Sequence, residues 1–339
     1  MIYDVIIIGA GAAGLFAGAS LPSPVNGLII DRKAVPGKKL LLSGAGQCNL
    51  THGGNIKEFI SHYGENGGQI RSVLYRFNNH SVMDFFNKKG IPLFQREDGK
   101  VFPKSLQAQE VLDVLVRSCR ENGLTFCFSA SVEQISFSKP TQKEIDPLDL
   151  DAPIYTIHCG DRSFQTKKLI LATGGCSYPG TGSDGSLFPI IRELGIEVRS
   201  LAPALVPIYV DQYPYKDLSG ISFQNAVVSI GPDANMTGAS GTVKGKALHQ
   251  NSDALLLTHN GFSGPAILNH SRYAHPGDIL RINYIPSKSL ERITSELSKA
   301  LSGNNKQLLT LLYEYFNENS KEYPAELPKR FLELICQRA

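Results

Sequence analysis

The stretch 5-Val-Ile-Ile-Ile-Gly-Ala-Gly-Ala-Ala-Gly-14 decides the fold, because β-branched residues lead into three spaced glycines and an apolar, helix-like segment follows at 15–19. Gly9 allows a tight turn off the strand, Gly11 lets the backbone approach a pyrophosphate, and Gly14 lets the helix pack closely on the sheet. The N-terminus of that helix presents free N–H groups and a positive dipole end to phosphates. The stretch predicts a dinucleotide-binding βαβ unit.

A second apolar run, at 27–30, supports this prediction because it ends in Asp31, seventeen residues (31 − 14) after Gly14. An acidic residue about 20 residues past such a fingerprint accepts hydrogen bonds from ribose hydroxyls. We therefore expect the backbone of Ala12 and Ala13 at the pyrophosphate and Asp31 at the adenosine ribose. The alternative is an ordinary strand and turn that ends in a solvated aspartate.

Length and composition indicate a globular protein of two or three domains, since the chain has 339 residues and 42% of them are hydrophobic. The net charge of +3 is not typical of a nucleic-acid binder, although it leaves a local basic patch open. The six cysteines occur singly, without the spacing of metal ligands, so we expect no metal and a reducing, cytoplasmic location. No apolar run approaches the roughly 18 residues of a spanning helix, and the N-terminus does not resemble a signal peptide.

Periodicity and turn signals predict the elements of the first part of the chain. Residues 37–51 contain too much glycine for a packed helix and are expected to wrap a ligand as a loop. The other expected elements are helical spacing over 70–89, short strands at 91–94 and 101–102, a helix at 108–121, strands at 124–128 and 132–137, an exposed hairpin loop at 139–153, a strand pair at 155–159 and 164–166, and a buried strand from 168 that ends at Thr173-Gly174-Gly175.

Two shifts in composition predict domain boundaries. Near Leu201 the pattern changes to short strands separated by Gly, Pro and Asn, as in a small β-barrel or sandwich. From Ser287 onward it changes to helices at 290–301, 307–317 and 328–337. We therefore expect an α/β protein with three domains: a Rossmann-like domain at 1–198, an inserted β-barrel-like domain at 199–286 and a helical domain at 287–339.

Five stretches together resemble one family, the bacterial HI0933-like flavoproteins, which are NAD(P)/FAD-dependent oxidoreductases that include an aminoacetone oxidase type. They are the fingerprint, Gly37-Lys38-Lys39 through the Ser43–Thr51 loop, Ala172-Thr173-Gly174-Gly175, Ser177-Tyr178-Pro179, and Leu257 through Pro265. The resemblance covers nearly the whole chain. It implies FAD as cofactor and an FAD-binding Rossmann-like domain that is interrupted by a β-barrel and a small helical domain.

The chain departs from the family pattern at two places. Members usually carry Arg or Lys before the Cys-Asn pair of the loop, whereas this chain has Gln47, so we expect one cationic contact to be missing. Members also continue past the helical domain with a return strand and a glycine-rich segment that covers the flavin. This chain ends at Gln337-Arg338-Ala339, and we expect a truncated product that lacks part of the FAD pocket.

The fingerprint and the resemblance together assign the cofactor-binding residues. Lys39 is preferred to Lys38 for phosphate by resemblance, with solvated surface lysines as the alternative. Cys48 either faces the flavin or is a small buried hydrophobe, as isolated cysteines more often are. The expected set is Gly9, Gly11, Ala12, Ala13, Gly14, Asp31, Arg32, Lys39, Ser43, Gly44, Gly46, Cys48, Asn49, Thr51, Val132, Thr173, Gly174 and Gly175.

No catalytic side chain is assigned from the sequence. His52 and His259 are candidates for acid–base work because an imidazole transfers protons near neutral pH. A histidine beside Gly and Asn in a loop is more often a structural hydrogen bonder, and we favour that role for both. Arg96, Lys100 and Lys104 are expected either to border the substrate entrance or to solvate a face.

These observations predict an FAD-dependent oxidoreductase that transfers hydride between flavin and an organic substrate, with reduction of an activated C=C bond as the preferred direction. No second fingerprint follows the first, so NAD(P)H is expected only as a transient donor. The alternatives are an amine oxidase, an RNA reductase that forms dihydrouridine, and a non-catalytic nucleotide-binding fragment. RNA as a partner is neither supported nor excluded by the charge, and the oligomeric state is left open.

Overall fold

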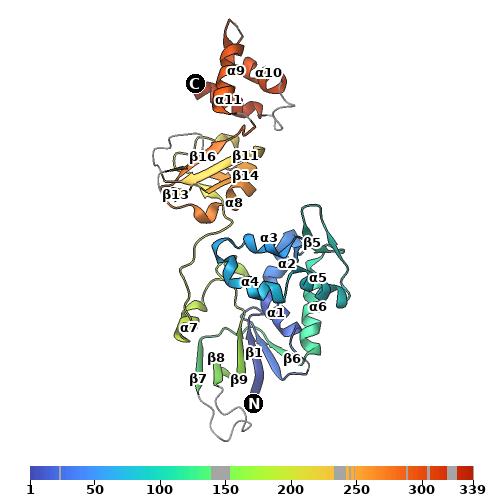
Figure 1. Ribbon diagram of the computed structural model, residues 1–339. Helices are drawn as coiled ribbons and strands as arrows, with labels where there is room; N and C mark the ends of the chain where they lie inside the picture. Colours follow the sequence, from blue (N-terminus) through green and yellow to red (C-terminus); the bar gives the residue numbers. More distant parts are fainter. Residues whose placement is uncertain are drawn as a thin grey trace. The chain divides into compact units, whose positions relative to one another are not determined.

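The β-branched run of the fingerprint lies at the centre of a mixed sheet in the computed structural model (Figure 1). Among the described residues the sheet has six strands in the order β6-β2-β1-β9-β8-β7. Their bounds are β1 Ile2–Ile8, β2 Gly27–Ile30, β6 Leu124–Cys127, β7 Gln134–Ser138, β8 Ile154–Cys159 and β9 Arg162–Leu171. Strands β6, β2, β1 and β9 are parallel neighbours, whereas β9, β8 and β7 form an antiparallel meander.

The structure describes residues 1–22, 24–138, 153–232, 242–243, 246–247, 249–287, 289–303, 306–318 and 327–338. They form two compact units, Met1–Arg199 and Ser200–Ala339. The loop expected at 139–153 lies, apart from its last residue, outside the described residues. The division into three domains stays a prediction.

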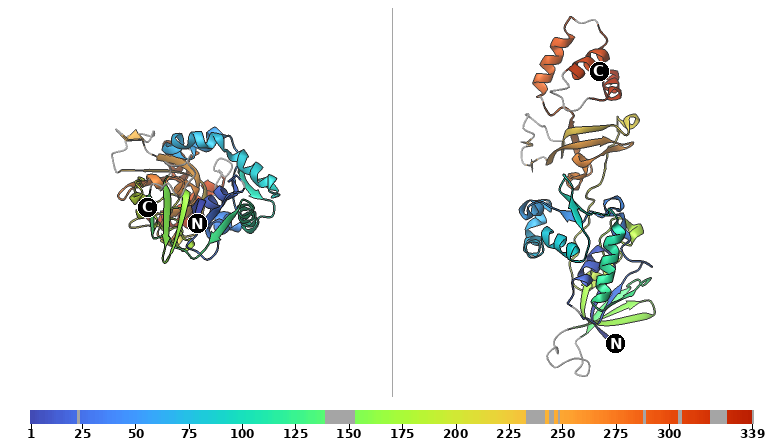
Figure 2. Two further views of the ribbon diagram at one scale, coloured as in Figure 1. Left: turned by 90° about the horizontal axis from the view of Figure 1, so that it is seen from below. Right: turned by 90° about the vertical axis from the view of Figure 1, so that its right-hand side faces the viewer.

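Side chains of β1 alternate between two hydrophobic clusters, as the period of two in a strand requires. Val5 and Ile7 pack under helices α1 (Ala12–Ala19) and α6 (Ala108–Glu121), and the right-hand view of Figure 2 shows α6 running beside the sheet. Ile6 and Ile8 belong to the cluster on the opposite face. Because β1 is buried on both faces, its sequence is continuously apolar rather than alternating.

Glycine allows α1 to lie directly on the strand ends. A Cβ at Gly14 would overlap the carbonyl oxygen of Gly9 and would lie 3.3 Å from the Cβ of Ala172, at the end of β9. Gly14 therefore has the packing role that the fingerprint predicts for its third glycine.

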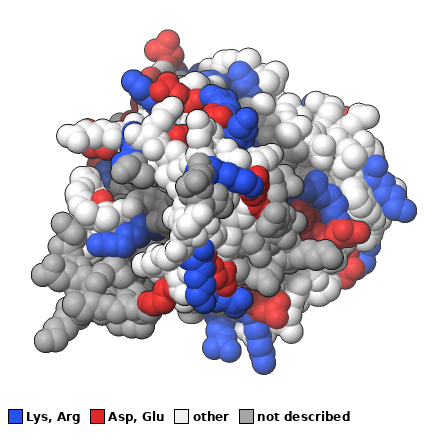
Figure 3. Space-filling model, turned by 90° about the horizontal axis from the view of Figure 1, so that it is seen from above, with Lys and Arg blue, Asp and Glu red and all other residues white. Residues whose placement is uncertain are grey.

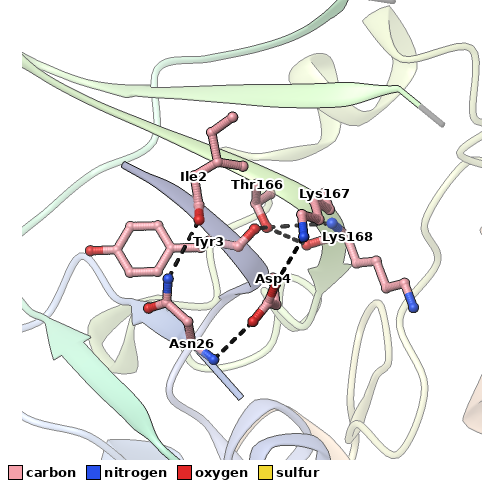
Figure 4. Close-up of polar contacts among 7 residues, drawn as sticks. All are labelled: Ile2, Tyr3, Asp4, Asn26, Thr166, Lys167 and Lys168. Carbon is pink, nitrogen blue, oxygen red and sulfur yellow. Dashed lines mark hydrogen bonds and ion pairs between the residues drawn. The ribbon is translucent and has the colours of Figure 1, made fainter. Parts of the chain in front are cut away.

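A group of polar contacts joins the beginning of β1 to its neighbours (Figure 4). The backbone N–H of Asn26, just before β2, donates to Asp4 Oδ2 over 3.1 Å, and Lys167 Nζ of β9 donates to Asp4 Oδ1 over 3.3 Å. Thr166 Oγ1 donates to the carbonyl oxygen of Tyr3 over 3.1 Å. The hydrogen bond from Asn26 and then the pairing with Lys167 lower the pKa of Asp4. These contacts lie at the end of the sheet opposite the glycine fingerprint.

The segment between β2 and β6 carries short elements around a small antiparallel sheet, β3-β5-β4. These elements are α2 Lys38–Leu42, η1 Ser43–Gly46, β3 Thr51–His52, α3 Ile56–Ser61, η2 Gly64–Asn66, α4 Gly67–Arg76, α5 Asn79–Lys88, β4 Leu93–Gln95 and β5 Lys100–Pro103.

Three sequence predictions about this unit are corrected. The helical pattern over 70–89 is two helices, because Asn78 and Ser81 form a capping box that starts α5. The expected strands at 164–166 and 168–171 are one strand, β9, since pairing to both β8 and β1 keeps it extended. The strand expected from 132 begins only at Gln134.

The second unit contains a five-stranded antiparallel sheet in its described part, in the order β10-β15-β14-β11-β16. The bounds are β10 Ile208–Tyr209, β11 Ser222–Gly231, β14 His249–Leu257, β15 Gly261–Ser263 and β16 Ile279–Asn283. A separate pair consists of β12 Thr242–Val243 and β13 Lys246–Ala247.

Helices of the second unit share the core of this sheet. Phe331 of α11 packs against Phe223 of β11, with ring centroids 4.9 Å apart. The helices of the second unit in the described residues are α8 Pro265–Leu268, α9 Leu290–Leu301, α10 Leu308–Glu318 and α11 Lys329–Arg338, together with the turns η4 Lys216–Leu218 and η5 Ser271–Tyr273. The first unit also contains the turn η3 Pro179–Thr181 and the helix α7 Phe188–Glu193. Within the described ranges, no helix combines the length and apolarity that crossing a membrane requires.

Candidate functional site

A cavity of about 1490 Å³ lies in the first unit, where the parallel strands end. Ile8, the last residue of β1, pairs with Ile30 of β2 and with Leu171 of β9, so these three strands end together. Ligands of open α/β sheets bind outside the carboxyl ends of the strands. The cavity exceeds the roughly 300–1,000 Å³ of ordinary small-molecule pockets, and it therefore suits a large, extended ligand.

The fingerprint turn forms one wall of this cavity. Gly9 has φ +109°, and a Cβ there would overlap the carbonyl oxygen of Ala172, so the turn requires glycine. A Cβ at Gly11 would meet no heavy atom of the described residues within 4 Å beyond its chain neighbours, so this position opens onto space. The first helical bond runs from Leu15 N–H to Gly11 C=O, and the amides of Ala12 and Ala13 precede that ladder.

Asp31 is held by backbone amides on both sides. Its Oδ2 accepts a hydrogen bond from Ala10 N–H and its Oδ1 accepts one from Lys33 N–H, each over 2.7 Å. A carboxylate oxygen has two lone pairs, so each oxygen retains a site for another donor. The carboxylate is therefore fixed in position at the cavity wall and is still able to accept hydrogen bonds from ribose hydroxyls.

Arg32 connects the end of β2 to a loop 152 residues later in the chain. Its Nη1 lies 2.6 Å from Asp184 Oδ2 and donates to Ser186 Oγ over 3.0 Å. The hydrogen bonds from Ser186 and then the Arg32 guanidinium hold the pKa of Asp184 well below its usual range. All three residues line the cavity, so Arg32 shapes its wall as half of an ion pair.

The expected wrapping loop at 37–51 begins as a helix, which corrects the prediction. Its first residues form α2, because Gly37 adopts φ +70° and its N–H donates to Ala10 C=O, which positions the turn that precedes the helix. The chain then turns sharply at Gly44 and Ala45, both in the left-handed region. Lys38 and Lys39 both line the cavity, Lys38 exposed and Lys39 half-buried.

Cys48 lies in the wall of the cavity and is buried. Its N–H donates to the carbonyl oxygen of Ser43 over 3.0 Å. Burial raises the pKa of the Cys48 thiol, and a hydrogen bond with the Ser43 side chain opposes this in part. A buried, protonated thiol is a weak nucleophile, which favours the structural role for Cys48.

Most of the predicted site residues come together around this one cavity. The residues that line it are Gly9, Gly11, Ala12, Ala13, Asp31, Arg32, Lys39, Ser43, Cys48, Asn49, Thr51, Val132, Thr173 and Gly174. Gly14, Gly44, Gly46 and Gly175 do not line it. The first three of these shape the backbone, because Gly14 packs under the fingerprint turn and both Gly44 and Gly46 have positive φ.

Both ring nitrogens of His52 are used in hydrogen bonds to the backbone. Its Nδ1 accepts a hydrogen bond from Gly54 N–H, so the proton of the neutral ring is on Nε2, which donates to the carbonyl oxygen of Asp98 over 3.1 Å. His52 is therefore a structural hydrogen bonder in this arrangement. His259 is exposed in the turn between β14 and β15, in the second unit.

The basic residues Arg96, Lys100 and Lys104, in and around β5, do not line the cavity. Asp98 Oδ2 pairs with Arg96 Nη2 over 3.0 Å and with Lys100 Nζ over 2.9 Å. The Lys100 and Arg96 side chains hold the pKa of Asp98 well below its usual range. Lys104 N–H donates to the carbonyl oxygen of Pro92. Arg96 and Lys100 thus stabilise the β4–β5 turn rather than bordering this cavity.

Two groups of lining residues were missed from the sequence. The aromatic residues Phe16 and Phe59 come from α1 and α3, and Tyr63 and Phe77 come from the connections that follow α3 and α4. The Phe16 and Phe77 rings lie 5.6 Å apart. The loop 181–188 also lines the cavity. Its Thr-Gly-Ser-Asp-Gly-Ser sequence follows an apolar strand as the 37–51 segment does, and this signal could have identified it. That strand is β9, and its residues 168–171 are exposed or half-buried rather than buried as predicted. Within the described ranges, no group of three His, Cys, Asp or Glu side chains is placed to hold a metal.

Comparison with known proteins places this arrangement in a family. The family model described as the HI0933-like protein Rossmann domain matches residues 3–264. A second model, the HI0933-like protein barrel and H2TH domain, matches residues 202–335.

Curated relatives cover almost the whole chain. The ribosomal RNA dihydrouridine synthase of Escherichia coli (strain K12) is 31% identical over 99% of this chain and 74% of that protein. The protein of the same name from Haemophilus influenzae is 29% identical over 98% of this chain and 74% of its own length. The 3-dehydro-bile acid delta(4,6)-reductase of Clostridium scindens is 26% identical over 97% of this chain and 74% of its own length.

Proposed function

The chain belongs to the HI0933-like protein family, and we propose, from that premise, that it is an FAD-dependent oxidoreductase that binds FAD in the cavity of the first unit and reduces a C=C bond conjugated to a carbonyl group. Bound FAD supplies the two-electron chemistry that no side chain of the cavity can supply. The proposal rests on one observation: the fingerprint, Asp31 and the 37–51 segment all line the same cavity.

The residues present fit FAD on three counts. The open space at Gly11 leaves room for a pyrophosphate beside the amides of Ala12 and Ala13. The carboxylate of Asp31 is oriented by Ala10 and Lys33 and retains lone pairs for a ribose. The cavity volume of about 1490 Å³ leaves room for a substrate as well.

The proposed reaction class follows from what the relatives' names have in common. A dihydrouridine synthase saturates a double bond in a pyrimidine ring, and a delta(4,6)-reductase saturates double bonds in a bile-acid ring. Each reduction adds one hydride and one proton across a C=C bond, and the electrons come from a two-electron donor. We propose NAD(P)H as a transient donor, because the sequence contains no second fingerprint that would hold it.

We propose, more specifically, that the substrate is a uridine in RNA. The surface around α3 and α4 supports this choice of substrate. Tyr63 and Phe77 line the cavity and are also about two-fifths exposed. The Arg71 guanidinium lies 5.7 Å from the Tyr75 ring centroid, and Arg76 is exposed nearby on α4. Aromatic faces next to basic side chains are how proteins hold unstacked RNA bases.

The overall charge gives RNA binding little additional support. The net charge is +3, and the face drawn in Figure 3 shows basic and acidic side chains interspersed among uncharged ones. With so small a net charge, RNA binding would depend on a local surface such as the one around α4.

An anaerobic titration tests the reaction class. The purified chain is reconstituted with FAD, reduced with NADH or NADPH, and mixed with a uridine-containing ribosomal RNA fragment or with a conjugated enone. We expect the flavin absorbance near 450 nm to bleach with the donor and to return on addition of one of these acceptors. Bleaching by a primary amine, with peroxide formed in air, would instead support the amine oxidase alternative.

The proposal that RNA is the substrate is tested separately, by measuring the dihydrouridine content of the RNA fragment after the reaction. Reoxidation by the enone alone, without dihydrouridine, would keep the reaction class and eliminate the RNA substrate. A chain that binds no FAD would refute the proposal as a whole.

A further inference from the structure

One buried amide at the cavity has an acceptor without a partner. Asn79 is the first residue of α5, is 3% exposed and lines the cavity. Its Nδ2 donates to the carbonyl oxygens of His52 and Gly54 over 2.7 and 2.8 Å. Its Oδ1 is buried and has no hydrogen-bond partner among the residues that the structure describes. A buried, unpaired acceptor costs about 1–3 kcal/mol, so its retention needs an explanation.

The two bonds of Nδ2 determine which way the amide faces. An amide nitrogen has two hydrogens, and both are directed to backbone carbonyls. Rotating the amide by 180° would place Oδ1 against those two carbonyl oxygens, which have no hydrogen to offer. Oδ1 of Asn79 is therefore always an acceptor at this position, and its partner must bring an N–H or O–H donor, as a water molecule or a ligand does.

The surroundings of Asn79 favour a flat ring with one polar edge. Val82 and Phe86 follow Asn79 on the same face of α5, at the i+3 and i+7 positions, and all three line the cavity. An apolar wall of this kind fits the face of a ring, whereas a chain with several hydroxyls would need several polar partners. His52 and Gly54, which hold the amide, directly follow the segment 37–51 that we assign to the cofactor.

We propose that Asn79 is a specificity-determining residue whose Oδ1 accepts the hydrogen bond of an imide N–H, a ring nitrogen between two carbonyl groups. This inference rests on the proposed function, in which two molecules carry such a group: the pyrimidine end of the flavin and a uracil substrate. The amide selects the ring that presents N–H at this edge. It touches no reacting atom in this role.

Methylation of the ring nitrogen tests the proposal on the unaltered protein. The dissociation constants of FAD and N3-methyl-FAD are measured for the wild-type chain by quenching of flavin fluorescence. Those of a uridine oligonucleotide and its N3-methyluridine counterpart are measured on the FAD-loaded chain by fluorescence anisotropy. We expect at least tenfold weaker binding of one of the two methylated ligands, which corresponds to about 1.4 kcal/mol. Discrimination in the first pair identifies the flavin as the partner, and discrimination in the second identifies the substrate.

Two variants separate recognition from folding. Asn79→Ala is expected to reduce the discrimination to less than threefold, because the acceptor is gone and the methyl group fits the space left. Ser81→Ala removes the hydroxyl that accepts from Asn78 N–H, whereas Asn78 Oδ1 still accepts from the backbone N–H of residue 81 and so stays in place in the cavity lining. This variant leaves Asn79 unaltered, so it should lower the thermal stability slightly and keep the discrimination.

The result that overturns the role of Asn79 is equal affinity for both members of both pairs in the wild-type chain. If FAD binds in that case, the proposed function survives and only this inference fails. If neither FAD nor N3-methyl-FAD binds, both fail together.

Discussion

Alanine at Gly14 and alanine at Gly11 are expected to have opposite effects, although both add one methyl group to the same fingerprint. At Gly14 the new Cβ would overlap the carbonyl oxygen of Gly9, lie 3.1 Å from its carbonyl carbon and lie 3.3 Å from the Cβ of Ala172. Carbon atoms pack best at about 3.5–4.0 Å, so helix α1 has to move away from the strand ends. At Gly11 the Cβ meets no described heavy atom within 4 Å beyond its chain neighbours, and φ is −85°, which alanine adopts freely.

The magnitudes follow from these contacts. Overpacking costs about 1–3 kcal/mol, and because two of the three neighbours of Gly14 are backbone atoms we expect about 2–3 kcal/mol for Gly14→Ala. For a unit of 150–250 residues this lowers the Tm by roughly 4–12 °C. Gly11→Ala should leave the Tm of the apoprotein unchanged or raise it slightly. It should weaken FAD binding at least about tenfold, because the methyl group occupies the space that the pyrophosphate needs.

Thermal unfolding of the apoproteins followed by circular dichroism, and FAD titration of the folded proteins, measure the two effects separately. Loss of stability in both variants would refute the distinction between a packing glycine and a cofactor glycine. Unchanged FAD affinity in Gly11→Ala would contradict the placement of the pyrophosphate at this turn.

Four further predictions concern single side chains. Asp31→Asn should cost about 1–3 kcal/mol in an unfolding titration, because its NH₂ group would face the N–H of Ala10 or Lys33, and equal stability would contradict this. Asp184 has a lowered pKa, so its contribution to stability is present above its ordinary pKa of 3.8 and is lost as the pH falls below it. Asp184→Asn should therefore flatten the acid limb of Tm against pH, and an unchanged limb would refute the pairing. Burial raises the pKa of Cys119 to about 12, so we expect iodoacetamide at pH 8.5 to label exposed Cys176 and to label Cys119 only after unfolding, as mass spectrometry would show. His52→Gln should lower the Tm but leave the pH–rate profile in place, whereas loss of one limb of the profile would restore His52 as a catalytic acid.

Local sequence patterns predicted a helix correctly where the apolar spacing and the start and stop residues all lie within or next to that helix. The helix α6 has the predicted bounds, 108–121, because its apolar residues repeat at helical spacing and Asn122-Gly123 stops it. Helix α9 has the predicted bounds 290–301 for similar reasons. The strand β9 was predicted as two pieces, since its continuity depends on pairing with both β8 and β1.

In the candidate site, too, features within a short stretch of chain were predicted and contacts between distant residues were not. The glycine spacing and Asp31 were readable because a nucleotide-binding turn lies within a short stretch of chain. The pairing of Arg32 with Asp184 was not, because it joins residues 152 positions apart. The role of His52 depended on the groups that each ring nitrogen meets, Gly54 N–H and the carbonyl oxygen of Asp98.

The sequence by itself determined that a strand, a glycine turn and a helix form a nucleotide-binding unit, because that chemistry depends on φ angles and spacings of neighbouring residues. Only the tertiary structure decided which distant side chains wall the cavity and which of their polar atoms lack a partner. The unpaired Oδ1 of Asn79 illustrates this, because its direction depends on two carbonyl groups some 25 residues earlier in the chain. The direction of such long-range hydrogen bonds depends on the packed fold, whereas local patterns encode only bonds between close neighbours, as in the capping box of α5.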